Sequence, residues 1–172
     1  MQTVKRALEK TLAAACVVLF ALLVATVVWQ VFSRQVLSDP STWSEEAARY
    51  LFVWLGFFGT ALVFSERGHI AVDFLVRKTP SAVQRAVGVL VQLVIIAFAA
   101  IALVWGGWRA SQGAWDTNLT ALPTQIGVMY LVMPITGVLI ILFALYHVVA
   151  VARGEEVPVD DDDLSTTSPE PV

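Results

Sequence analysis

The run from Leu12 to Phe32 is the feature that most constrains the fold of this chain. Thr26 and Gln30 are its only clearly polar residues, and the run is 21 residues long. As an α-helix it would be about 31 Å long, which matches the hydrocarbon thickness of a bilayer. Basic residues precede it, as in a secretory signal peptide. However, the run is longer than a typical signal core, and no small-x-small cleavage site closes it. The sequence therefore predicts an uncleaved membrane span over residues 12–32.

A second span is expected over residues 45–65. Its apolar part, from Tyr50 to Phe64, is short, and Thr42 and Glu45 have the spacing of a helix-capping box just after Pro40. We therefore expect this helix to begin near Trp43, among the lipid headgroups, and to enter the membrane at a tilt.

Two more spans are expected, over residues 86–108 and 126–151. The third follows Thr79 and Pro80, a good pair for starting a helix, and its first turns are expected to lie along the membrane surface. The fourth contains Pro134 in its middle, which lacks a backbone N–H and should kink the helix.

Composition agrees with a membrane protein. Hydrophobic residues make up 58% of the 172 residues, charged residues make up 15%, and the mean hydropathy is +0.74. Soluble proteins carry roughly 25% charged residues. We predict an all-α integral membrane domain over residues 1–153, with four transmembrane helices. Residues 154–172 are acidic and rich in Ser, Thr and Pro, so we expect a disordered tail.

The distribution of basic residues predicts the orientation. Eight Lys and Arg lie before the first span, around the second connection and after the fourth span, whereas three lie on the other side. Cytoplasmic loops carry the excess of Lys and Arg, so both termini are expected in the cytoplasm. The two groups are Lys5, Arg6, Lys10, Arg67, Arg77, Lys78, Arg85 and Arg153, against Arg34, Arg49 and Arg109.

The densest polar cluster lies at the start of the second span, from Trp43 to Tyr50. Glu45 and Arg49 are four residues apart with the acid first, which favours an ion pair on a helix, and Glu46 is three residues before Arg49. Charges at a membrane edge are costly unless paired or hydrated. Contact with a partner protein is the favoured interpretation, and an exposed pair that fixes the depth of the helix is the alternative.

Small residues lie on the same span. Gly56 and Gly59 are followed by Thr60, and small residues on one helix face allow another helix to approach closely. Packing among the four spans is slightly favoured over packing on another subunit.

The segment from Ser65 to Asp73 contains Glu66, Arg67, His69 and Asp73. This set is a weak signal for a metal or proton-relay site, because no second His is nearby, and a structured polar loop is favoured. Cys16 is the sole cysteine of the chain, so it has no partner for an internal disulfide.

The residue inventory argues against an enzyme, and no catalytic, cofactor or metal site is predicted. A haem protein would need axial ligands facing each other across the bundle, but the chain has two His, His69 and His147. No Asp or Glu lies well inside any apolar run, which argues against a small autonomous exchanger or channel. An independent transporter remains the main alternative, ahead of a redox protein.

These motifs, in this order and in a setting of four spans, resemble the small membrane subunit of tripartite ATP-independent periplasmic (TRAP) transporters, the DctQ-like family. The resemblance covers about residues 10–150. Its motifs are Trp43-Ser-Glu45-Glu46-x-x-Arg49-Tyr50-x-Phe52-x-Trp54-x-x-Phe57-x-Gly59, Gly68-His69-x-x-x-Asp73, Ala121-Leu122-Pro123 and Met133-Pro134-x-x-Gly137.

The resemblance implies a scaffold subunit in a sodium-coupled uptake system for an organic acid, typically a carboxylate, in a bacterial or archaeal inner membrane. The implied partners are a large membrane subunit in direct contact, a periplasmic substrate-binding protein and membrane lipids, with no nucleic acid and no cofactor. It implies interface or architectural roles, not substrate binding, for residues of these motifs. With the small residues and the proline above, the candidates are Trp43, Glu45, Glu46, Arg49, Trp54, Gly56, Gly59, His69, Asp73, Pro134 and Gly137.

Overall fold

The computed structural model describes residues 2–65 and 81–152. Four of its helical stretches are long and apolar enough to cross a membrane: Lys5–Gln35, Thr42–Ser65, Ala86–Gly113 and Ile126–Val149. No strand occurs in these two ranges, apart from an isolated bridge between Asn118 and Gln125. The structure therefore confirms the prediction of an all-helical, multi-pass membrane protein.

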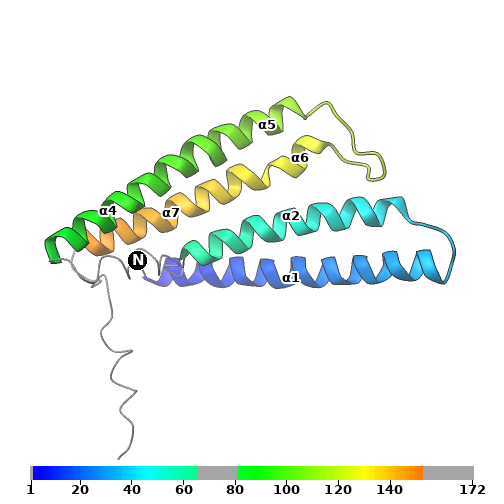
Figure 1. Ribbon diagram of the computed structural model, residues 1–172, viewed down its shortest axis with the longest axis horizontal. Helices are drawn as coiled ribbons and strands as arrows, with labels where there is room; N and C mark the ends of the chain where they lie inside the picture. Colours follow the sequence, from blue (N-terminus) through cyan, green and yellow to red (C-terminus); the bar gives the residue numbers. More distant parts are fainter. Residues whose placement is uncertain (1, 66–80, 153–172) are drawn as a thin grey trace, which may run out of the picture.

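The chain forms two helical hairpins (Figure 1). In the first, α1 (Gln2–Gln35) packs along α2 (Thr42–Ser65). In the second, a continuous helical rod packs along the last span. This rod consists of α4 (Ser81–Phe98), the π-helix η1 (Ala99–Gly106) and α5 (Gly107–Gly113), and the last span consists of α6 (Ile126–Tyr130) and α7 (Val132–Ala152).

The two hairpins meet through α2 and α7, near the end of the molecule where the N-terminus lies, and they diverge toward the other end (Figure 1). The buried core draws on all four spans: Leu12, Ala61, Ala99, Ile140 and Phe143. At the diverging end, the connection between α5 and α6 bends across to the beginning of α2 (Figure 1). The bundle is therefore closed tightly at one end and bridged by a loop at the other.

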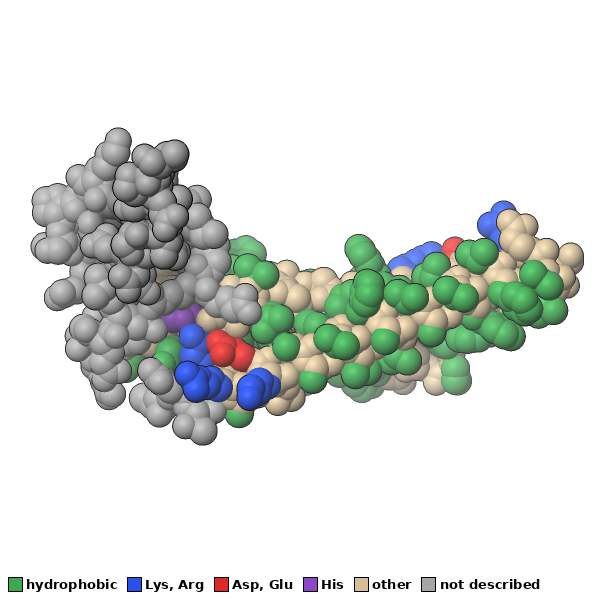
Figure 2. Space-filling view, turned by 90° about the horizontal axis from the view of Figure 1, so that it is seen from below, with side chains coloured by type: hydrophobic (Ala, Val, Ile, Leu, Met, Phe, Trp, Pro, Cys, Tyr) green, Lys and Arg blue, Asp and Glu red, His purple; other side chains and the backbone are tan. Residues whose placement is uncertain are grey.

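Hydrophobic side chains cover the outside of the bundle. On the face shown in Figure 2 they extend along its length, and the charged side chains gather toward its two ends. Val17, Val18 and Phe20 of α1 are all more than half exposed. Such a surface is stable in the hydrocarbon of a bilayer. In water it would be unfavourable, because exposing apolar area to water costs free energy.

Two helix bounds can be explained from the sequence: the break in the last span and the length of α1. The last span breaks at Leu131, between α6 and α7. Pro134 has no N–H to donate to the carbonyl four residues earlier, which explains a break within the preceding turn. α1 has 34 residues, so it is about 51 Å long and exceeds the hydrocarbon thickness. It therefore tilts or projects from the membrane.

Two expectations fall partly or wholly outside the described ranges. The disordered acidic tail is one of them. The other is the surface-lying start of the third span: α4 begins at Ser81, but the side chains of residues 81–85 are outside the description. Both stay predictions.

Candidate functional site

Glu46 connects the two hairpins at the diverging end of the bundle. One of its carboxylate oxygens accepts the backbone N–H of Thr120 at 3.2 Å, and the other accepts those of Ala121 and Leu122 at 2.8 and 3.1 Å. Hydrogen bonds to a charged acceptor are about twice as strong as neutral ones. We call this arrangement the Glu46 latch. It holds the α5–α6 connection against the first turns of α2.

Glu45 and Arg49, by contrast, face outward. Their side chains are 65% and 68% exposed, and the distance from Arg49 Nη2 to Glu45 Oε1 is 3.7 Å. An exposed pair of this kind contributes little stability. Trp43, two residues before Glu45, is 45% exposed. Within the described ranges, Arg49 forms no ion pair with Glu46, so the cluster divides into an internal latch and an outward-facing pair. A partner contact for Glu45, Arg49 and Trp43 stays a prediction.

Serine side chains join the end of α1 to the beginning of α2. Ser44 Oγ donates to the carbonyl of Ser41 at 2.8 Å and also contacts Ser41 Oγ. Ser33 Oγ lies 3.4 Å from Ser41 Oγ. Ser41 and Ser44 therefore provide the local polar contacts at this helix start, where the sequence had suggested Thr42 and Glu45. These contacts hold the start of α2 in place, and Glu46 follows it by less than two turns.

Three glycines lie at the contact between the third and fourth spans. A Cβ added at Gly107 would lie 2.6 Å from Met133 Cβ, and one at Gly137 would lie 2.8 Å from Leu103 Cβ. At Gly127 it would lie 2.6 Å from the carbonyl oxygen of Ser111, whose hydroxyl donates to the Gly127 carbonyl at 2.7 Å. Close packing of helix backbones in membranes depends on such residues.

Gly137 was a candidate from the sequence, whereas Gly107, Gly127 and Ser111 were missed. Gly107 and Gly127 interrupt apolar runs, and this is the signal that could have found them. The π-helix η1, which brings Leu103 and Val104 against Gly137, left no signal that we can identify in the sequence.

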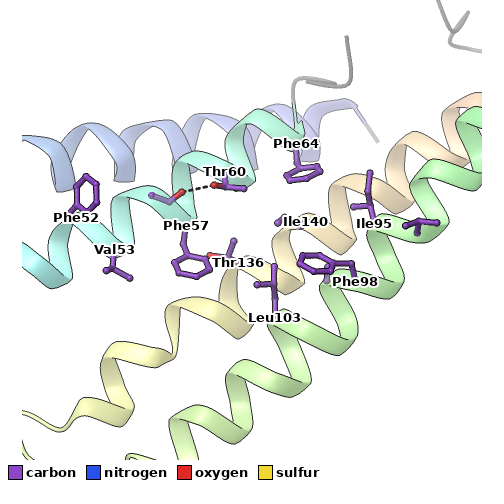
Figure 3. Close-up of a pocket in the computed structure, with 13 residues that line it drawn as sticks. Phe52, Val53, Phe57, Thr60, Phe64, Ile95, Phe98, Leu103, Thr136 and Ile140 are labelled. Atoms are coloured by element: carbon purple, nitrogen blue, oxygen red, sulfur yellow. Dashed lines mark hydrogen bonds between the residues drawn. The ribbon is translucent and has the colours of Figure 1, made fainter. Parts of the chain in front are cut away.

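Gly56 and Gly59 show the opposite environment. A Cβ added at either would meet no atom within 4 Å, so among the described residues neither glycine packs closely on another span. Gly56 instead lines a groove of about 610 Å³ (Figure 3). We call it the α2 groove: its walls are residues 52–64 of α2 and 94–103 of α4 and η1, and Thr136 and Ile140 of α7 form its floor.

Trp54 lines a second, smaller hollow of about 310 Å³ between α1, α2 and α6. Its ring packs edge-on against Phe58, with the ring centroids 5.6 Å apart. Its indole Nε1 is buried and has no hydrogen-bond partner in the part of the chain that the structure describes. Trp54 therefore lies between the two hairpins, and its architectural role stays a prediction.

Of the remaining candidate residues, two are outside the described ranges and one is buried between helices. His69 and Asp73 lie among residues 66–80, which the structure does not describe. No group of three or more His, Cys, Asp or Glu with a metal-binding arrangement occurs within residues 2–65 and 81–152. Pro134 is buried and packs against Gly107.

The fold and these surfaces define a class: a small, multi-pass helical membrane protein. The family model for the DctQ component of tripartite ATP-independent periplasmic transporters matches residues 23–154. The chain belongs to this family, which is a family of transporter components and not of enzymes, as the sequence motifs had indicated.

Curated relatives fall into two groups. The first consists of small subunits. The sialic acid TRAP transporter small permease protein SiaQ of Vibrio cholerae is 29% identical over 72% of this chain and 70% of its own length. A putative TRAP transporter small permease protein of Haemophilus influenzae is 26% identical over 81% and 86%.

The second group consists of larger permeases. The sialic acid TRAP transporter permease protein SiaT of Haemophilus influenzae is 34% identical over 46% of this chain, and the match covers 12% of SiaT. A segment like this chain is therefore a small part of one longer permease polypeptide.

Proposed function

We propose that this chain is the small scaffold subunit of a TRAP uptake transporter and that it packs on a large permease subunit. The match to SiaT is the observation that carries the proposal, because there a segment similar to this chain belongs to the same polypeptide as a larger permease. The isethionate TRAP transporter permease protein DctMQ of Oleidesulfovibrio alaskensis, 25% identical over 56% of this chain and 15% of its own, gives the same support.

The geometry suits a scaffold. The two hairpins are held together by the Glu46 latch at one end and by a shared core at the other. Within residues 5–65 and 86–149, no Asp, Glu, Lys or Arg is among the buried side chains. Charged groups inside a membrane domain typically mark ion and substrate pathways. We therefore assign sodium coupling and substrate movement to the large subunit.

The substrate class is an organic acid. The relatives are named for sialic acid, isethionate and, for a Pseudomonas aeruginosa protein 37% identical over 40% of this chain, C4-dicarboxylate. All are organic anions at neutral pH, since sulfonates and these carboxylates have pKa values well below seven. A periplasmic binding protein would deliver the acid to the large subunit, and the transporter would lie in the inner membrane.

Reconstitution in liposomes separates this proposal from an independent small transporter. The probes are radiolabelled sialic acid, succinate and isethionate, offered under an inward sodium gradient. We expect no uptake by the purified chain alone, and uptake of one organic acid when the large subunit and the binding protein of the same system are present. Uptake of any probe by the chain alone would overturn the scaffold assignment.

A further inference from the structure

The α2 groove is a concave, almost entirely apolar surface on the outside of the bundle (Figure 3). None of the described residues that line it is charged. One of its two hydroxyl groups, that of Thr60, is already satisfied, because it donates to the Gly56 carbonyl at 2.8 Å. We propose that this groove is the docking site for a transmembrane helix of the large permease subunit. The inference rests on the proposed function and assigns its contact surface.

The groove has the length of a helix contact. Its α2 wall extends over residues 52–64, which is about 18 Å or roughly three helical turns. A helix 10–12 Å across occupies roughly 400–600 Å³ per turn. The groove volume of about 610 Å³ therefore accommodates one side of a three-turn segment.

The walls of the groove suit close packing of a helix. At Gly56 the backbone is bare, since an added Cβ would meet no atom within 4 Å. Phe52 on one rim is 67% exposed, and Val94 and Phe98 on the other are 61% and 62% exposed. A helix seated on the glycine would be enclosed by these side chains. Helix association in membranes depends on this kind of close van der Waals packing around small residues.

The floor contains one polar atom without a partner among the described residues. Thr136 is fully buried there, and its Oγ1 has no hydrogen-bond partner among residues 2–65 and 81–152. Buried hydroxyl groups usually have a partner. Because no part of Thr136 is exposed, a Ser, Thr or Asn side chain of the docking helix would reach this hydroxyl only after the neighbouring groove side chains move aside.

These features favour a protein helix over a phospholipid. A bound phospholipid is held by its headgroup as well as by its chains, and the lining residues that the structure describes offer no charged group to a phosphate. The outer face of α1 is the contrasting surface: Val17, Val18 and Phe20 are exposed there, as expected for contact with lipid chains. The family model also matches α2, the third span and α7, which together build the groove.

The test fills the α2 groove with a bulky side chain and measures assembly with the large permease subunit. Tagged Gly56→Trp is co-expressed with the large permease subunit of the same transporter, and the retained large subunit is quantified. Gly88→Trp is the matched control, because Gly88 is also an open glycine within a span but does not line the groove. We expect Gly56→Trp to reduce the amount of retained large subunit about tenfold, because a bulky side chain in a packed contact is destabilising. Gly88→Trp should retain the large subunit at the wild-type level. Size-exclusion chromatography and the helical circular dichroism signal of each variant alone check that it is folded.

A photocrosslinking residue at Phe98 provides an independent readout that needs no destabilising change. We expect a crosslink from this position to the large subunit, and none from the same residue at Val18. Retention of the large subunit by folded Gly56→Trp at the wild-type level would overturn the docking site. So would a crosslink from position 98 to phospholipid only, or to a second copy of the chain. A wild-type chain that retains no large subunit would overturn the proposed function itself.

Discussion

Gly107 of α5 lies directly against Pro134 of α7, and a Cβ added at Gly107 would be 2.9 Å from the proline Cδ. The contact joins the third span to the fourth just after the break at Leu131. Because Pro134 weakens the helix at that point, packing on Gly107 holds the two parts of the last span in place.

Gly107→Ala is therefore expected to destabilise the folded protein. The new methyl group would lie 2.6 Å from Met133 Cβ, so one of the spans must shift. Overpacking of this kind costs about 1–3 kcal/mol. Thermal unfolding in detergent measures the loss. Gly88→Ala is the control, since its methyl group meets no atom of the described residues within 4 Å, and the change should be neutral or slightly stabilising. Equal stability of both variants would contradict the contact.

Glu46→Ala should release the α5–α6 connection. Three backbone N–H groups lose a charged acceptor, and hydrogen bonds to charged groups contribute about 1.5–3 kcal/mol. Hydrogen exchange should accelerate at the amides of residues 120–122. Glu45→Ala removes an exposed ion pair of about 0.5 kcal/mol or less and should leave these amides unchanged. If both variants exchanged at the same rate, the latch would have no structural role.

Ser111→Ala tests the hydrogen bond between α5 and α6. It removes the donor to the buried Gly127 carbonyl at 2.7 Å and leaves that carbonyl without this partner, at a cost of about 1 kcal/mol or more. Thr11→Ala is the comparison, because the Thr11 hydroxyl is exposed and bonds only within its own helix. Unfolding free energies in detergent should differ between the two. An unchanged value for Ser111→Ala would contradict the importance of this bond.

The orientation is tested by fusions. An even number of spans would place both ends of the chain on the same side of the membrane, and the excess of Lys and Arg predicts that this side is the cytoplasm. A green fluorescent protein fused after the C-terminus should fluoresce, whereas alkaline phosphatase fused there should be inactive. Inserted into the connection around Gln35 to Pro40, alkaline phosphatase should be active. The reverse pattern would show the opposite orientation.

The spans were predictable because they depend on local features. Apolar length defined the four helices, and Pro134 indicated the break that occurs at Leu131. The Glu46 latch was not predictable in the same way, because its partners lie more than seventy residues away along the chain. Spacing suggested Arg49 as a helical neighbour of Glu46, but in the structure the Glu46 carboxylate accepts the backbone N–H groups of residues 120–122 instead.

The packing partners of the small residues were likewise not predictable from the sequence. Gly56, Gly59, Gly107, Gly127 and Gly137 all lie in or beside apolar runs, and the sequence does not show which of them face another span of the same chain. Packing decides this: Gly107, Gly127 and Gly137 contact neighbouring helices, whereas Gly56 and Gly59 contact no other helix that the structure describes. The distinction separates internal packing from the open α2 groove.

Co-purification tests the central claim most directly. The large permease subunit of the same transporter carries the tag, the untagged chain is co-expressed, and the complex is isolated in mild detergent and separated by size. We predict that the chain elutes with the large subunit in a constant ratio across the peak. Elution of the folded chain by itself, while the large subunit remains folded and monodisperse, would contradict its assignment as a packed scaffold subunit.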